Sequence, residues 1–175
     1  MNHLLGLRCT VCGATYARDE LDYVCPHHGD EGIVDAIYDY AAIAAATAPA
    51  LLSASREMSM WRYRDLLPLA ADAAPPPLQV GWTPLYAAPR LAAALGLRHL
   101  YVKDDGRNPT ASFKDRASAL VLLKAQEQKA AIVTTASTGN AGAALAGLAA
   151  SMGQRTVIFA PKTAPPAKIA QLLTY

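Results

Sequence analysis

The stretch N-P-T-A-S-F-K-D-R, from Asn108 to Arg116, decides how this 175-residue chain is interpreted. Its first three residues form a rigid turn, and Lys114 then stands beside Phe113 at the start of a helix predicted over residues 115–129. A lysine at a helix start is normally a solvated charge, and it opposes the helix dipole there. A neutral amine, which desolvation by an apolar neighbour favours, can instead form a Schiff base. Both interpretations remain open from these residues alone.

A second segment, Ser137 to Asn140, joins a predicted strand to a predicted helix. The apolar run 131–135 is typical of a buried strand, and residues 140–152 form a helix of small residues that ends at Gly153. Backbone N–H groups and the positive end of the helix dipole converge at such a turn, where they can hold a carboxylate or a phosphate. An ordinary helix cap explains the Ser, Thr and Asn residues equally well.

Alternating strands and helices from Gly81 onward predict an α/β fold in which a parallel sheet is flanked by helices. The predicted strands cover residues 99–103, 131–135 and 155–160, and the predicted helices cover 115–129, 140–152 and the segment from Pro165 onward. These strands are too few for a complete doubly wound sheet, so we expect the fold to be incomplete. The expected organisation is a zinc-ribbon-like unit at 1–35, a helix and linker at 36–80, and the first part of an α/β region at 81–175.

All three cysteines lie in the first segment, where Cys9 and Cys12 precede Cys25 and a pair of histidines. Two close pairs of ligands separated by a short loop can close a tetrahedral zinc site. The second pair is Cys25 with His28 at the same spacing, or alternatively Cys25 with His27. Four protein ligands leave no open position for water, so the predicted zinc ion is structural. The alternative is three thiols beside unrelated histidines.

The composition excludes several classes of function. Hydrophobic residues make up 53% of the chain, enough for a packed core, and 16 basic residues against 14 acidic residues leave a net charge of +2. That balance gives no electrostatic case for binding nucleic acid or a membrane surface. The start has no secretory signal pattern, and the Ala-rich stretch 41–52 indicates a helix broken near Pro49 rather than a membrane span. A cytoplasmic location is therefore expected.

Several motifs together resemble a known family. Residues 109–116, followed by Ser-Thr-Gly-Asn at 137–140, resemble the pyridoxal-phosphate enzymes of the tryptophan-synthase-β fold type (fold type II), and within them most closely the threonine synthases. G-W-T-P-L at 81–85 and K-D-D-G-R-N-P-T at 103–110 are similar to further motifs of that family, with Asp105 in place of the family's glutamate. The cysteine-rich start and the W-R-Y tripeptide at 61–63 resemble a subset of the threonine synthases.

The resemblance implies a role for each matching residue. Lys114 would bind pyridoxal 5′-phosphate covalently and later move protons at the substrate's Cα and Cβ. Asn140 would donate a hydrogen bond to the cofactor's phenolic oxygen, and Ser137, Thr138 and Gly139 would bind the substrate carboxylate. The implied reaction converts O-phospho-L-homoserine and water into L-threonine and phosphate. The expected partner is thus a small-molecule substrate, and a homodimer is compatible with the sequence.

The chain also departs from the family pattern. The family's Gly-rich loop for the cofactor phosphate and its C-terminal Ser or Thr have no counterpart after Asn140. We therefore expect an N-terminal fragment that is inactive, or nearly so, by itself and that belongs to an active parent.

Two other functions compete with this interpretation. A threonine or serine dehydratase shares the fold type, but dehydratases usually lack a cysteine-rich start. A zinc-ribbon module that binds nucleic acid needs a basic face, whereas residues 8–35 carry Arg8 and Arg18 against six acidic residues, which repel phosphate. On charge alone Lys103 and Arg116 are candidate contacts for a substrate phosphate, although a structural role is favoured for both.

Overall fold

The structure is a computed structural model that describes residues 3–21 and 23–175. The chain divides into two compact units, and each is described by itself. Unit 1 comprises Met1–Glu57 and Arg62–Asp72, and unit 2 comprises Met58–Trp61 and Ala73–Tyr175. Within the described residues, no helix combines the length and the apolar character that crossing a membrane requires.

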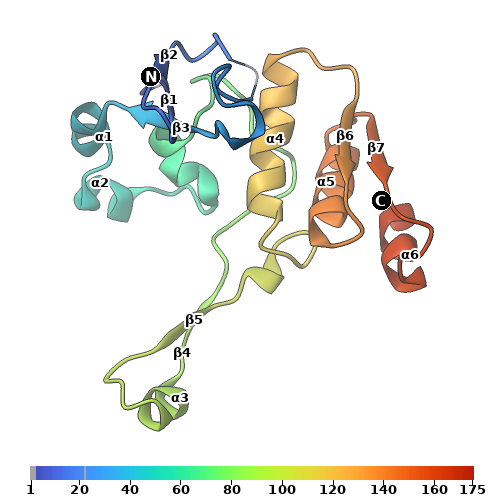
Figure 1. Cartoon of the computed structure of the whole chain (residues 1–175). Coiled ribbons are helices and arrows are strands. Elements are labelled where there is room, and N and C mark those ends of the chain that lie inside the picture. Colours follow the sequence, from blue (N-terminus) through green and yellow to red (C-terminus); the bar gives the residue numbers. More distant parts are fainter. Residues whose placement is uncertain (1–2, 22) are drawn as a thin grey trace. The chain divides into compact units, whose positions relative to one another are not determined.

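Unit 1 is built around a three-stranded antiparallel sheet with the strand order β2–β1–β3 (Figure 1). Its elements are β1 (Leu4–Cys9), β2 (Thr15–Tyr16), the 3-10 helix η1 (Gly29–Glu31), β3 (Val34–Tyr38), α1 (Tyr40–Ala46) and α2 (Pro49–Ala54). A further 3-10 helix, η2 (Met60–Leu66), contains residues of both units.

The helical region expected after residue 35 starts later than its composition indicates. Residues up to Tyr38 belong to β3, because they pair with β1; Ala36 lies opposite Leu7. The predicted break near Pro49 is confirmed. Asp39 caps α1 by accepting a hydrogen bond from the N–H of Ala42 at 2.9 Å, and Pro49 begins α2, where its missing N–H needs no partner.

Unit 2 contains a two-stranded antiparallel ladder followed by an α/β layer. Its elements are β4 (Leu85–Ala87), α3 (Pro89–Ala94), β5 (Tyr101–Lys103), the 3-10 helix η3 (Asp105–Arg107), α4 (Asp115–Glu127), β6 (Val133–Ala136), α5 (Asn140–Ser151), β7 (Thr156–Phe159) and α6 (Pro166–Thr174).

The predicted strand at 99–103 exists as β5, but it is not part of a parallel sheet. It pairs antiparallel with β4 in a separate two-stranded ladder, where Leu85 lies opposite Lys103 and Ala87 opposite Tyr101. Hydrophobic periodicity identifies a strand without giving the direction of its partner, so the expectation of one sheet with three parallel strands was wrong for this strand.

The remaining strands form the predicted βαβ arrangement. β6 and β7 are parallel, with Val133 opposite Thr156, and α5 connects them. α4 packs against α5 (Figure 1), and the buried core of this layer includes Ala119, Leu122, Leu123, Ala144, Leu145 and Leu148. As predicted, Gly153 follows the end of α5 with a left-handed φ of 65°, and Pro166 lies in the first turn of α6.

Candidate active site

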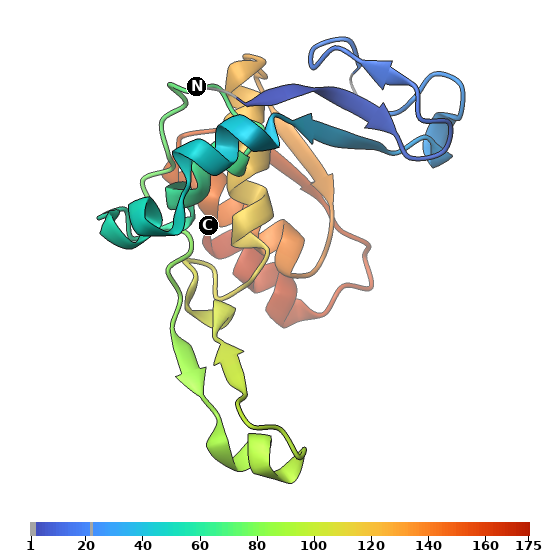
Figure 2. The same ribbon diagram turned by 90° about the vertical axis from the view of Figure 1, so that its left-hand side faces the viewer.

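Two helices of unit 2 begin at the same end of the α/β layer. Figures 1 and 2 show α4 and α5 side by side, and both start at the end where β6 finishes. Lys114 is the residue that precedes α4, and Asn140 is the first residue of α5. The topology therefore brings the lysine motif and the predicted anion-binding turn to neighbouring helix ends, although they are separated in the sequence.

Hydrogen bonds fix the backbone on both sides of Lys114. The fully buried carboxylate of Asp115 accepts from the N–H of Thr110 at 2.8 Å and from its hydroxyl at 2.5 Å. The hydroxyl oxygen of Ser112 accepts from the N–H of Lys114 at 3.0 Å. Ala111, between Thr110 and Ser112, has a left-handed φ of 56°. A residue with a Cβ adopts this conformation only when its surroundings enforce it. The lysine is thus carried on a rigid loop, as a positioned functional group requires.

Asn108 ties this loop to the G-W-T-P-L segment. Its Oδ1 accepts from the N–H of Gly81 at 2.9 Å, and its Nδ2 donates to the carbonyl of Asp105 at 2.9 Å. Gly81 has a φ of 88°, and a Cβ at this position would lie 2.7 Å from the backbone nitrogen of Met60. Only glycine satisfies both conditions, so local packing explains the glycine of one motif and the asparagine of another.

A charged cluster strengthens the same connection. Arg116 donates two hydrogen bonds to the carboxylate of Asp105, at 2.8 and 2.9 Å, and Thr83 donates a third at 2.6 Å. The Arg116 guanidinium holds the pKa of Asp105 at about 2, because its hydrogen bonds favour the charged carboxylate and outweigh the effect of burial. Lys103 donates to the carbonyl of Thr83 at 2.5 Å. These contacts give both basic residues the structural role that the sequence favours.

The side chain of Lys114 is exposed, and its amine lies 5.7 Å from the centre of the Phe113 ring. Phe113 is itself 61% exposed. The desolvation that the sequence analysis expects from this neighbour is therefore not observed. The ring can contribute a cation–π contact, and the amine remains accessible to an aldehyde.

The S-T-G-N turn folds back over the first turn of α5. The hydroxyl oxygen of Ser137 accepts from the N–H groups of Gly139 and Gly142, at 3.3 and 3.1 Å. A Cβ at Gly142 would lie 2.6 Å from the Ser137 carbonyl oxygen, so glycine permits this close approach. The N–H groups of Asn140 and Ala141 are in the first helical turn and have no intrahelical acceptor. The turn is therefore capped by Ser137 and still offers donors to an anion.

Gly139 and Gly147 have different surroundings. A Cβ at Gly139 would meet no atom within 4 Å, so its side of the turn is open to a ligand. A Cβ at Gly147 would lie 2.7 Å from Cγ2 of Thr110. The missing side chain of Gly147 thus lets the N-P-T loop rest directly on α5, and this contact joins the two halves of the candidate site.

The structure adds Lys168, a residue that the sequence analysis did not single out. Its Nζ donates to Oδ1 of Asn140 at 3.3 Å. Lys168 lies in the first turn of α6, where a cation opposes the helix dipole. That unfavourable position after Pro165 and Pro166 is the signal that could have drawn attention to it.

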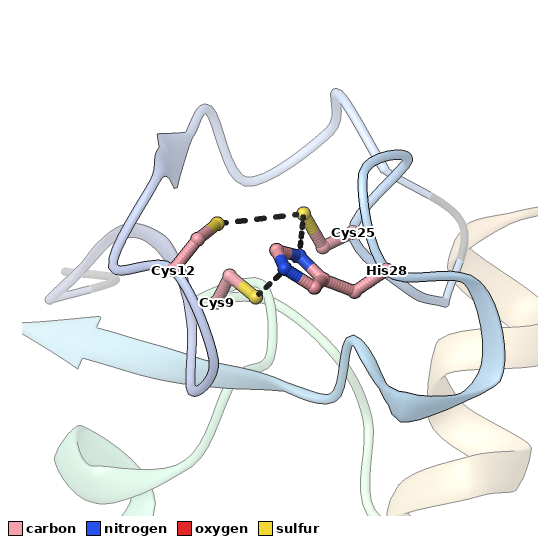
Figure 3. A group of neighbouring side chains, drawn as sticks. All are labelled: Cys9, Cys12, Cys25 and His28. Carbon is pink, nitrogen blue, oxygen red and sulfur yellow. Dashed lines mark hydrogen bonds between the residues drawn. The ribbon is translucent and has the colours of Figure 1, made fainter.

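Unit 1 brings together the four predicted metal ligands, Cys9, Cys12, Cys25 and His28 (Figure 3). Cys9 and Cys12 come from the end of β1 and the turn after it, and His28 precedes η1. Their ligand atoms all lie within 4.8 Å of one another. The Cys12–Cys25 Sγ distance is 3.9 Å, and Nδ1 of His28 lies 3.7 Å from the Cys25 sulfur and 4.0 Å from the Cys9 sulfur.

Two further residues shape this cysteine–histidine cluster. The Tyr16 hydroxyl lies 2.9 Å from Sγ of Cys25, and this hydrogen bond, followed by burial, raises the pKa of Tyr16 to about 12. Burial raises the pKa of the Cys25 thiol, but hydrogen bonds from His28, Tyr16 and the backbone of His27 outweigh it and bring the pKa to about 6. A Cβ at Gly32 would lie 2.9 Å from the Cys25 Cβ, so this glycine allows the second ligand pair to close.

Comparison with known protein families shows which family the α/β layer matches. Residues 77–175, more than half of the chain, match the family described as pyridoxal-phosphate dependent enzyme. This chain belongs to the pyridoxal-phosphate-dependent enzymes. The matched segment contains both the lysine loop and the S-T-G-N turn.

Individual relatives in this family are similar over nearly the whole chain. The threonine synthase of Methanosarcina acetivorans is 42% identical over 155 residues, 89% of this chain and 36% of the relative. The threonine synthase of Methanocaldococcus jannaschii is 38% identical over 169 residues, 96% of this chain and 41% of the relative. The chain thus spans roughly two fifths of the length of these relatives. Among solved structures, a pyridoxal 5′-phosphate-dependent aspartate racemase is 32% identical, with a TM-score of 0.49, over 53% of this chain and 30% of the racemase.

The residues of this pyridoxal-phosphate enzyme fit the cofactor that its family uses. Lys114 offers an accessible amine on a rigid loop, and Asn140 offers an amide at the neighbouring helix end. The open side of Gly139 leaves room for a ligand to approach the N–H groups of α5. An aldehyde that carries anionic oxygens matches this set of groups.

Proposed function

We propose that residues 1–175 are the lysine-bearing part of a threonine synthase, which converts O-phospho-L-homoserine and water into L-threonine and phosphate. The observation that carries this proposal is the similarity to two proteins of that name, because it extends across both units of the chain. The match to the Methanocaldococcus jannaschii protein covers 96% of this chain, so it includes the cysteine-rich start as well as the α/β layer that a dehydratase would share.

In this function Lys114 holds the cofactor and transfers protons. Bound pyridoxal phosphate supplies an electron sink for negative charge that develops on the substrate carbons. The Lys114 amine would take a proton from the substrate Cα and exchange protons at Cβ, acting as a general acid–base group. Its fixed backbone limits the positions that the amine can sample, which favours productive proton transfer.

The turn at the start of α5 binds and orients the substrate. Ser137, Thr138 and Gly139, with the following N–H groups, hold the α-carboxylate against the positive end of the helix. The Asn140 amide would donate a hydrogen bond to the phenolic oxygen of the cofactor. Lys114 is located at the neighbouring helix end, so this role requires that a substrate anchored at its carboxylate present its Cα and Cβ in that direction.

The reaction test uses the protein that contains this chain, supplied with pyridoxal phosphate. Incubation with O-phospho-L-homoserine should release phosphate and L-threonine in equal amounts, and incubation with L-threonine should release no ammonia. Ammonia and 2-oxobutanoate from L-threonine, without phosphate release from the first substrate, would identify a dehydratase instead.

The assignment of Lys114 has its own test. Borohydride reduction of the same protein with bound cofactor, followed by peptide mapping, should place the label on the peptide that contains Lys114. The Lys114→Ala variant should carry no label. A label on another lysine in the unsubstituted protein would overturn the role of Lys114.

We also propose that the cysteine–histidine cluster binds a structural zinc ion through Cys9, Cys12, Cys25 and Nδ1 of His28. In a tetrahedral site with Zn–S bonds of about 2.3 Å, sulfur ligands lie about 3.8 Å apart, and the Cys12–Cys25 distance of 3.9 Å fits this geometry. Four protein ligands fill the coordination shell, which supports a structural ion rather than a catalytic one.

Metal analysis of purified variants tests the zinc site. The protein should contain one zinc ion per chain, and Cys25→Ser and His28→Ala should reduce the bound zinc, each by at least tenfold at limiting metal. His27→Ala is the matched control. His27 is adjacent to His28 but is not one of the four proposed ligands, so its substitution should leave the zinc content unchanged. Loss of zinc in His27→Ala but not in His28→Ala would reverse the ligand assignment.

A further inference from the structure

The contact between Lys168 and Asn140 joins two helices of the α/β layer. The Lys168 ammonium donates to Oδ1 of Asn140 at 3.3 Å. α6 also packs near the start of α5, since a Cβ at Gly142 would lie 3.4 Å from Cδ2 of Leu172. Helix packing therefore sets the position from which the lysine reaches Asn140.

The charge of Lys168 has no acidic partner in this part of the fold. Neither α5 nor α6 contains an aspartate or a glutamate, and Lys168 forms no ion pair within residues 3–21 and 23–175. A lysine in a first helical turn also opposes the helix dipole. Helix stability alone therefore does not account for a lysine at this position.

An ammonium group next to an amide fixes which end of the amide faces outward. The Asn140 side chain has one acceptor, Oδ1, and two donor hydrogens on Nδ2. Lysine only donates, so the flipped amide would set donors against donors. With Oδ1 held by Lys168, the Nδ2 donors are directed away from the ammonium and remain available to an anionic oxygen.

We propose that Lys168 is a positioning residue that holds the Asn140 amide with its Nδ2 donors turned toward the cofactor. This inference rests on the proposed function, in which Asn140 donates to the phenolic oxygen of pyridoxal phosphate. Lys168 acts through Asn140 and contacts neither substrate nor reacting atoms.

The test compares three variants of the protein that contains this chain: Lys168→Met, Lys168→Arg and the control Lys162→Met, which removes a lysine from the β7–α6 connection. Lys168→Met should weaken pyridoxal phosphate binding roughly tenfold, the effect of one lost charge-assisted hydrogen bond. It should also shift the visible absorption band of the bound cofactor, because that band depends on the hydrogen bond at the phenolic oxygen. Lys168→Arg should restore both properties, and Lys162→Met should leave both unchanged.

A double variant separates positioning from a direct effect of charge. In an Asn140→Ala background, Lys168→Met should cause little further loss of cofactor affinity, because the residue through which it acts is gone. The proposal would be overturned if the double variant lost cofactor affinity by the product of the two single-variant factors. It would also be overturned if Lys168→Met left the absorption band unchanged. If the unsubstituted protein attaches no cofactor at Lys114, the proposed function itself fails, and this outcome is distinct from a failure of Lys168 alone.

Discussion

At the scale of single residues, Asp105 connects three parts of the candidate site. It accepts hydrogen bonds from Arg116 of α4 and from Thr83 of the G-W-T-P-L segment. Its carbonyl accepts from Asn108, which belongs to the loop that carries Lys114. The substitution of aspartate for the family's glutamate therefore keeps the acidic group that these donors need.

The lowered pKa of Asp105 predicts how the stability of unit 2 depends on pH. The folded value of about 2 lies below the ordinary value of 3.8, which corresponds to about 2 kcal/mol of stabilisation. Because the folded pKa is depressed, this stabilisation is complete well above pH 4 and is lost as the pH falls toward 2. Asp105→Asn should therefore lower the free energy of unfolding by about 2 kcal/mol at pH 6 and by about half as much at pH 3.

Urea unfolding of residues 1–175 monitored by tryptophan fluorescence measures this change in unit 2, because both tryptophans of this segment, Trp61 and Trp82, belong to that unit. Asp104→Asn is the matched control: its partner Arg107 is 68% exposed, so the change should cost less than about 1 kcal/mol. An Asp105→Asn effect that stays constant between pH 6 and pH 3 contradicts the assigned pKa.

At the scale of elements, the sequence predicts most of what lies within one element and little of what lies between elements. The predicted helix over 140–152 and the turn before it were found nearly as expected, because Gly153 and the small residues act locally. The antiparallel pairing of β5 with β4 was missed, since the partner of a strand is set by tertiary structure. Lys168 was missed for the same reason, because only packing of α6 on α5 brings it to Asn140.

Two of the glycines in the α5 region, Gly139 and Gly147, predict different effects of the same substitution. Gly147→Ala would place a Cβ 2.7 Å from Thr110 Cγ2 and should push the N-P-T loop away from α5, lowering the stability of unit 2 by about 1–3 kcal/mol. Gly139→Ala meets no atom within 4 Å and should leave stability nearly unchanged while weakening cofactor binding at the open side of the turn. Tryptophan fluorescence and cofactor titration measure the two effects, and equal destabilisation by both substitutions would be inconsistent with this packing.

At the scale of the whole molecule, each unit is stabilised in its own way. Unit 2 buries a layer of aliphatic and alanine side chains between its helices and strands. In the described part of the segment before β3 no aliphatic side chain is buried, and the two most buried side chains are Cys9 and Cys25. A metal site can replace a hydrophobic core in so small a unit, whereas unit 2 has no such need.

Metal removal should therefore loosen unit 1 selectively. With zinc chelated, amide hydrogen exchange should accelerate by at least tenfold across β1 and β3, because these strands and the connecting turns carry the four proposed ligands and the binding free energy is lost from folding. Exchange in α4 and α5 should stay within about twofold, since neither helix contributes a ligand. The His27→Ala variant should respond as the unsubstituted protein does, while Cys25→Ser should show fast exchange in β1 and β3 even before chelation. Equal acceleration in α4 and β1 would mean that the metal supports both units, and no acceleration in β1 would mean that this unit folds through its sheet alone.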